Sequence, residues 1–264
     1  MTKTNHPAPF SAEIIDVLRT LIPRDQPVHD PFAGDGRRLA ALCADLGVRF
    51  TGTELEAPFI RDDRVRPGNS LDASTYPRRP GFTIVTSPVY PNGVADHHHA
   101  QERCKRCEGT GRMKVHRIDA VVQEYETCDK CGGSGRRNHH RRTYRQARAS
   151  IVGRDEPLHQ DNMGRWGYRG RGAMSDARIM YWSLANRIVA RWHRAGLVLV
   201  NVSDFLHSNG RRETVVDQWG YVLSVNGWKV TKAIDVATRR YKDGANRDAR
   251  VEAEVILVAR RVSS

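Results

Sequence analysis

The sequence predicts a doubly wound α/β sheet that is interrupted by a long insertion. Residues 26–55 have the pattern of strand, glycine turn, helix and strand that opens such a sheet. Alternating strands and helices return at about residue 175 and continue to the end of the chain, whereas residues 96–173 show no amphipathic period. A chain of 264 residues, 39% hydrophobic, can form one α/β domain with a sizeable core or two small domains.

The first part of the chain predicts two helices and three strands. A helix is expected from Ser11 to Ile22, because Ser11 can cap its first turn and apolar residues recur at helical spacing. A short strand at residues 26–29 runs into the glycine turn DPFAGDG, and a helix at 38–46 is closed by Gly47. Further strands are expected at residues 48–55 and 82–86.

The second part of the chain predicts the rest of the same sheet. Helices are expected at residues 175–195 and 213–225, with a strand at 197–206 between them. Strands at 228–236 and 251–260 have the pattern of a closing hairpin. One domain interrupted by an insertion follows: residues 1–100 are its first part, 101–137 the insert and 138–264 its second part, which includes a basic loop region at 138–173.

The charge of the chain predicts a polyanionic partner. There are 43 Lys and Arg against 30 Asp and Glu, a net charge of +13, and the sequence pI is about 10.0. Residues 103–148 hold 13 Lys or Arg and 5 Asp or Glu, a local net charge of +8. Neutralised phosphates release counterions, so this segment favours nucleic acid as the partner. The alternative is a basic surface that keeps the protein soluble.

The hydropathy of the chain predicts a cytoplasmic protein with no membrane partner. No apolar run approaches the roughly 18 residues that span a bilayer. Residues 196–202 form the best candidate and read as a buried strand. The first residues lack the apolar stretch of a secretory signal.

The turn DPFAGDG, residues 30–36, is a candidate cofactor site. Its glycines let the backbone approach a ligand, and the following helix N-terminus favours an anionic group. Glu54 lies at the end of the next strand, 18 residues after Gly36, near the spacing at which a carboxylate binds ribose hydroxyls. These residues alone do not separate S-adenosylmethionine from NAD, and a tight connection without a ligand is the alternative.

Two motifs together give the chain a resemblance to a known family. DPFAGDG, followed after a later strand by SPVYP, resembles the class I amino-methyltransferases of DNA, whose motifs are D-P-F-x-G-x-G and S/D/N-P-P-Y. The segments SPVYPNGVADHH, RRTYRQA and NVSDF are similar to methylases encoded by bacteriophages. The resemblance implies the class I methyltransferase fold, S-adenosylmethionine as cofactor, methylation of an exocyclic amine of a DNA base, and the cytoplasm of a bacterial host as location.

The resemblance also implies which residues contact the cofactor. HPAPFS matches the N-terminal cofactor motif, and VRPGNSLDA falls where the family contacts the adenine. The implied contacts are Pro9, Phe10, Asp30, Phe32, Ala33, Gly34, Gly36, Glu54 and Asn69. Arg37 departs from the family, which commonly has a small hydroxyl residue there.

In the family's scheme, SPVY carries the chemistry. The Ser87 side chain and the Pro88 carbonyl accept the two hydrogens of the target amine, and Tyr90 stacks on a base flipped out of the helix. A serine in the first position slightly favours cytosine N4 over adenine N6. Val89 stands where the family has a second proline, which could loosen the site or alter its substrate preference.

Four of the five cysteines predict a structural zinc site. CKRCEGTG and CDKCGGSG are two copies of C-x-x-C-x-G-x-G, with 20 residues between the pairs. Four thiolates at this spacing can close a tetrahedral site with no open position for water, and disulfides or unbound thiols are the alternatives. The repeat resembles half of the cysteine-rich module of J-domain co-chaperones. The expected ligands of one Zn²⁺ per chain are Cys104, Cys107, Cys128 and Cys131, while Cys43 is expected to be an inert core thiol.

The flanks of the insert mix cationic and aromatic residues, which suits contact with DNA phosphates and stacking on bases. The candidate nucleic-acid contacts are Arg137, Arg141, Arg142, Tyr144, Arg145, Arg165, Trp166 and Tyr168. A solvated loop is the alternative. Residues 97–99, three histidines, are expected to line the base site or face solvent rather than bind a second metal.

Two other functions remain open from the sequence. An RNA amino-methyltransferase would use the same fold and similar chemistry. A non-catalytic, zinc-containing nucleic-acid-binding protein on a degenerate methyltransferase scaffold is the second, and Val89 is its only support.

Overall fold

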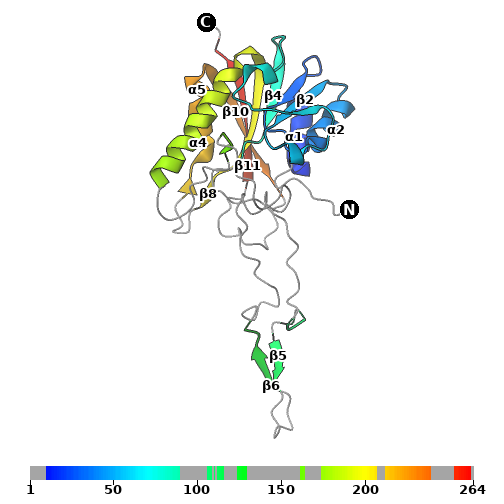
Figure 1. The fold of residues 1–264 in the computed structure, drawn as a ribbon, viewed down its shortest axis with the longest axis vertical. Coiled ribbons are helices and arrows are strands. Elements are labelled where there is room, and N and C mark those ends of the chain that lie inside the picture. The colour runs from blue at the N-terminus through cyan, green and yellow to red at the C-terminus, as the bar shows by residue number, and fades with distance from the viewer. Residues whose placement is uncertain are drawn as a thin grey trace.

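The computed structural model describes residues 10–89, 106–108, 110, 112–115, 124–129, 161–163, 174–206, 212–238 and 253–262. Its main feature is a seven-stranded sheet, with strand order β10-β11-β7-β4-β1-β2-β3 and helices on both faces (Figure 1). The doubly wound α/β sheet expected from the sequence is therefore confirmed.

The strands of this sheet are β1 (Val28–Asp30), β2 (Phe50–Glu54), β3 (Val65–Pro67), β4 (Phe82–Thr86), β7 (Ala195–Val202), β10 (Trp228–Ala237) and β11 (Ala253–Arg261). The α-helices are α1 (Ala12–Leu21), α2 (Arg37–Asp45), α4 (Met174–Val189) and α5 (Val215–Val225). Short 3-10 helices are η1 (Ala57–Phe59), η2 (Ala73–Thr75) and η4 (Ala190–Arg194), and β8 (Phe205–Leu206) pairs with β9 (Arg212–Glu213).

The directions of the strands place several loops at one edge of the sheet. β3, β2, β1, β4 and β7 run parallel, so the loops that follow them leave from the same edge. β11 is antiparallel to both β7 and β10. Counted within this sheet, the order is 3-2-1-4-5-7-6 with the seventh strand antiparallel, which is the class I methyltransferase form of the Rossmann-like fold.

Each face of the sheet packs against its own pair of helices. On one face, α4 and α5 bury Tyr181 and Trp219 against β4 and β7. On the other, α1 and α2 bury Ile14 and Leu39, together with alternate residues of β7 such as Leu199. β7 is therefore buried on both sides, which explains its nearly continuous apolar sequence.

Several local expectations are confirmed. The Ser11 hydroxyl oxygen accepts a hydrogen bond from the Ile14 N–H (3.2 Å) and caps α1. Gly47 follows α2 with φ +70°. Cys43 is buried in the core, and burial raises the pKa of its thiol to about 12, so it is inert as expected.

Other expectations were wrong. β3 was not expected from the sequence, so residues 82–86 form the fourth strand of the sheet and not the third. The helix expected to reach residue 195 ends at Val189 and continues as η4, and Ala195 already begins β7. The strand expected to continue to residue 206 ends at Val202.

Part of the predicted insert is described. β5 (Arg112–Val115) and β6 (Glu124–Thr127) pair antiparallel as a two-stranded sheet, which lies apart from the main sheet in Figure 1. Among the helices of the described residues, none has the length and apolar character needed to cross a membrane.

Candidate active site

The glycine turn after β1 is built on a buried carboxylate. Oδ1 of Asp30 accepts hydrogen bonds from the Phe32 N–H (2.9 Å) and from Oγ1 of Thr86 (2.7 Å), the last residue of β4. Burial raises the pKa of Asp30 to about 7, and these two bonds oppose that rise. Asp30 therefore ties the turn to the end of the neighbouring strand instead of facing solvent.

The glycines of the turn allow it to approach the adjacent strands closely. Gly34 and Gly36 have φ values of +57° and +72°, which favour glycine. A Cβ atom at Gly36 would lie 2.4 Å from Cγ2 of Val65 in β3. The turn is held in place by the Ala33 N–H, which donates to the Thr53 carbonyl (3.0 Å).

Glu54 lies at the end of β2 and faces this turn. Its Oε2 accepts from the Gly34 N–H (2.9 Å), and its Oε1 accepts from the Glu56 N–H (2.8 Å). Burial raises the pKa of Glu54 to about 7. Each carboxylate oxygen can accept two hydrogen bonds, so these contacts leave capacity for two more donors. A carboxylate with this capacity can accept two neighbouring hydroxyl groups.

Asn69 follows β3 and belongs to the same edge of the sheet. Its Oδ1 accepts from the Leu71 N–H (3.0 Å), which shapes the loop. The next residue, Ser70, donates through its hydroxyl to the carbonyl of Pro31 in the glycine turn. The adenine-contacting residue implied by the resemblance therefore lies in a loop that is hydrogen-bonded to the glycine turn.

Residues 161–163 also belong to this region, although nothing in the sequence predicted a role for them in the site. Oδ2 of Asp161 accepts from Nδ2 of Asn69 (2.8 Å), and Nδ2 of the buried Asn162 donates to Oε1 of Glu56 (2.9 Å). Met163 is buried in the core cluster that also contains residues of α4. The partners lie 92 and 106 positions away in the sequence, so no local sequence pattern predicts these contacts.

The proposed catalytic motif follows β4. Pro88 is buried, while Ser87 and Val89 are half-buried. Oη of Tyr181, in α4, donates a hydrogen bond of 2.6 Å to the carbonyl oxygen of Val89. β4 pairs with β1 on one side and with β7 on the other. The motif that follows β4 therefore begins between the glycine turn, which follows β1, and NVSD, which begins near the end of β7.

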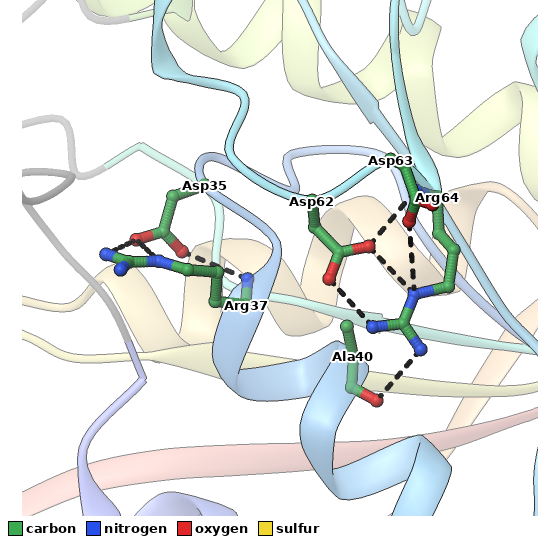
Figure 2. A network of polar contacts seen from close by, with 6 residues as sticks. All are labelled: Asp35, Arg37, Ala40, Asp62, Asp63 and Arg64. Atoms are coloured by element: carbon green, nitrogen blue, oxygen red, sulfur yellow. Dashed lines mark hydrogen bonds and ion pairs between the residues drawn. The ribbon is translucent and has the colours of Figure 1, made fainter.

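Two charged pairs border the glycine turn (Figure 2). The Arg37 guanidinium donates to Oδ2 of Asp35 through Nη2 (2.8 Å) and Nε (3.2 Å), next to the start of α2. Arg64 makes a bidentate contact with Asp62 (2.7 and 2.8 Å), and its Nη1 donates to the Ala40 carbonyl (3.5 Å). Arg37, which departs from the family pattern, is thus paired locally with Asp35.

The N-terminal segment reaches the same helix. Phe10 is buried against α1 and α2, and its carbonyl accepts a hydrogen bond from the Arg38 guanidinium. Pro9, the other residue of the implied N-terminal motif, lies outside the described residues, as does Tyr90 of the catalytic motif.

Of the four predicted zinc ligands, the structure describes two. Cys107 and Cys128 are both buried, although they flank a two-stranded hairpin, and a salt bridge joins their neighbours Arg106 and Asp129 (3.2 Å). Cys104 and Cys131 lie outside the described residues. Within the part of the chain that the structure describes, no group of three or more His, Cys, Asp or Glu forms a metal site. The zinc site therefore stays a prediction.

The predicted nucleic-acid contacts also stay predictions. They fall on residues 137–145 and 165–168, outside the described ranges, and so do the histidines at 97–99.

Comparisons with known proteins give distant likenesses only. No family model matches the chain, and no curated protein matches it. A solved Burkholderia thailandensis 1,6-didemethyltoxoflavin-N1-methyltransferase, with bound S-adenosylhomocysteine, is 14% identical over 96% of this chain and 80% of its own, with a TM-score of 0.42. A Streptomyces coelicolor geranyl diphosphate C-methyltransferase is 10% identical over 94% and 80%, with a TM-score of 0.41. The [4+2]-cyclase SpnF is 12% identical over 96% and 82%, with a TM-score of 0.44. Likenesses at these values do not identify a relative of the chain, and its fold follows from the strand order.

Proposed function

We propose that this chain is an S-adenosylmethionine-dependent methyltransferase that acts on the exocyclic amine of a DNA base. One observation carries the proposal: at one edge of the sheet, hydrogen bonds join the ends of four adjacent parallel strands and the loops that follow them. Gly34 is joined to Glu54, Asp30 to Thr86, and Ser70 to Pro31. The glycine turn, the acidic residue, Asn69 and SPVY thereby form one site at the edge where open α/β sheets bind ligands.

The residues of this edge fit the cofactor. The Glu54 carboxylate can accept two ribose hydroxyls while keeping its bonds to the Gly34 and Glu56 N–H groups. The loop of Asn69 would hold the adenine, and the glycine turn would hold the methionine end near the N-terminus of α2. When bound, the cofactor supplies an electrophilic methyl group on a sulfonium.

The work of the chain's own residues is to make the target amine reactive. An amine conjugated to an aromatic ring is a poor nucleophile, because its lone pair is delocalised. Acceptance of its two hydrogens by the Ser87 hydroxyl and the Pro88 carbonyl would direct that lone pair away from the ring. Methyl transfer would form a bond between the amine nitrogen and the methyl carbon as the bond from that carbon to sulfur breaks, and the amine would release one proton to solvent. Positioning of this kind contributes up to about 7–11 kcal/mol in well-oriented systems.

DNA is proposed as the substrate because of charge and motif. The net charge of +13 suits a phosphate backbone, and SPVY resembles the motif of enzymes that methylate amines of DNA bases. The serine in the first position slightly favours cytosine N4 over adenine N6.

A structural zinc ion in the insert is part of the proposal. Cys107 and Cys128 are buried in a segment of few apolar residues, and an exposed salt bridge joins their neighbours Arg106 and Asp129. A metal held by these thiolates and those of Cys104 and Cys131 would supply the stability that so small a hairpin cannot obtain from a core.

The test is methyl transfer from labelled cofactor to three acceptors: duplex DNA, single-stranded DNA and total RNA. Digestion to nucleosides and mass spectrometry then identify the methylated base. We expect 4-methylcytosine or N6-methyladenine in DNA, and none with Ser87→Ala. Label only in RNA would replace the proposal with an RNA methyltransferase. Cofactor binding without transfer to any acceptor, or no binding by calorimetry, would favour the non-catalytic alternative.

A further inference from the structure

We propose that Tyr181 is a positioning residue for the catalytic motif, and that its hydroxyl replaces the restraint of the proline that is missing at position 89. The inference rests on the proposed function, because it assigns a role within SPVY. It rests structurally on one contact: Oη of Tyr181 donates to the Val89 carbonyl oxygen at 2.6 Å, across 92 positions of the sequence.

The tyrosine is held rigidly by its surroundings. Its side chain is fully buried in the core cluster shared by α4, α5 and β4. Its ring meets Trp182 edge-on, with ring centroids 4.9 Å apart and planes at 79°. Trp182 in turn meets Trp219 of α5 at 5.9 Å. The hydroxyl therefore projects from a packed layer, and a distance of 2.6 Å lies at the short end of the range for O–H···O bonds.

The motif needs such a restraint because one of its acceptors is a backbone carbonyl. The direction of the Pro88 carbonyl depends on the peptide plane between residues 88 and 89. A proline at 89 would fix its own φ and restrict the ψ of residue 88. Valine leaves both torsions softer, so this sequence needs another means of fixing the plane.

Two contacts at Val89 supply that means. Its side chain packs against the same core cluster, and its carbonyl is bound by the Tyr181 hydroxyl. Residue 89 is thereby fixed on both sides of its Cα atom, by the side chain and by the following peptide plane. The preceding plane, which carries the Pro88 carbonyl, then has little freedom left.

The experiment is a double-mutant cycle of four proteins: the parent, Tyr181→Phe, Val89→Pro and the double variant. Tyr181→Phe removes one oxygen atom and keeps the packing. We expect kcat to fall about ten- to a hundredfold in Tyr181→Phe, the effect of a slightly misplaced acceptor, with cofactor affinity changed by less than about twofold. Val89→Pro should restore most of the lost kcat when it is added to Tyr181→Phe, and the single Val89→Pro variant completes the cycle.

Tyr76→Phe is the matched control. Tyr76 is also a buried tyrosine. Its hydroxyl donates to a backbone carbonyl, that of Ser70, at 2.8 Å, and accepts from Nε1 of Trp192 at 3.3 Å. Its removal should also lower thermal stability. Val89→Pro should not compensate for it in any property.

Two results would overturn the inference. One is a kcat of Tyr181→Phe equal to that of the parent. The other is a loss in Tyr181→Phe that persists in a folded, cofactor-binding double variant. If Val89→Pro does not fold, the inference is tested by Tyr181→Phe and Tyr76→Phe alone. Both kcat and cofactor affinity are then measured for the two variants, and only Tyr181→Phe should lose kcat while it keeps its cofactor affinity.

A readout independent of activity separates this inference from the proposed function. Hydrogen exchange of a peptide spanning residues 82–95, compared over the amides common to the four proteins, should quicken in Tyr181→Phe and slow again in the double variant. A parent that methylates no nucleic acid would refute the proposed function, while unchanged exchange would refute the restraint by Tyr181.

Discussion

The hydroxyl of Thr86 donates a hydrogen bond of 2.7 Å to Oδ1 of Asp30, and this bond joins the strand that leads into SPVY to the strand that leads into the glycine turn. Both side chains are buried. The relative position of the cofactor loop and the catalytic motif is therefore set by a specific contact within the sheet, in addition to the strand pairing of β1 with β4.

Thr86→Val should destabilise the protein by about 1–3 kcal/mol, because a buried carboxylate loses its hydroxyl donor while the volume is nearly conserved. Denaturant unfolding measures this change. The bond lowers the pKa of Asp30, so its removal should raise that pKa further, which titration by NMR can follow. Thr51→Val, which alters a hydroxyl on the neighbouring strand, is the comparison, and should leave Asp30 unaffected.

Ser87→Ala should abolish or greatly slow methyl transfer and leave cofactor affinity nearly unchanged, because the serine is proposed to act on the target amine. Single-turnover transfer and calorimetry measure the two properties separately. Activity within a few-fold of the parent would mean that the motif has been assigned wrongly.

Glu54→Ala should weaken cofactor binding by about 1.5–3 kcal/mol, the value of a hydrogen bond to a charged group. Calorimetric titration measures the loss. Unchanged affinity would move the ribose role to Glu56, the next acidic residue on that segment.

Cofactor binding should also depend on pH through Glu54. Burial raises its pKa to about 7, so the carboxylate is ionised above that pH and protonated below it. Hydroxyl donors bind the ionised form better, so affinity should rise as pH increases through about 7. The pKa of Asp30 is also raised to about 7. The part of the pH dependence of cofactor affinity that is due to Glu54 is therefore the difference between the pH profiles of the parent and Glu54→Gln. Identical pH profiles for the two proteins would contradict the assignment.

Gly36→Ala should destabilise the fold more than Gly47→Ala. Both glycines have positive φ, +72° and +70°, so both substitutions introduce backbone strain of roughly 1–2 kcal/mol. A Cβ atom at Gly36 also meets Val65 at 2.4 Å, whereas nothing lies within 4 Å of one at Gly47. Adding Val65→Ala to Gly36→Ala should recover the loss of stability caused by the steric clash, and should leave the loss caused by backbone strain. Equal unfolding free energies for the two single variants would show that the turn can move away from β3.

The insert should hold one zinc ion per chain, measurable by elemental analysis. Its removal should unfold the insert locally and leave cofactor binding intact, because the described residues of the seven-stranded sheet all lie within 10–89 and 174–262. DNA binding should weaken, since the segment 103–148 carries a net charge of +8, and each lost phosphate contact should flatten the salt dependence by about one unit of slope. If the double variant Cys128→Ser, Cys131→Ser binds DNA with the same affinity and the same salt dependence as the parent, the insert does not bind DNA. It is then a stabilising or partner-binding element.

The sequence predicted those parts of the fold and site whose signals are local. The cap at Ser11, the glycine turn and the apolar run of β7 can all be recognised within a few residues. β3 was missed because it has three residues, one of them proline and only Val65 buried, so no period develops. Asn162 and Tyr181 were missed as site residues because their partners, Glu56 and Val89, lie 106 and 92 positions away.

The pairing of β4 with β7 also has a consequence for how the chain folds. It brings Phe82 beside Ala195, more than a hundred positions apart, and much of the core on both faces depends on this closure. The entropy of closing such a loop grows only with the logarithm of its length, so halving the connection should change stability by about 0.6 kcal/mol. This pairing nevertheless forms late in folding, because contacts between residues that are distant in the sequence form slowly. We therefore expect a variant with a shortened connection to refold faster than the full chain while its equilibrium stability stays almost the same. The long insertion between the two halves of the sheet would then affect mainly the time the protein needs to reach its native state.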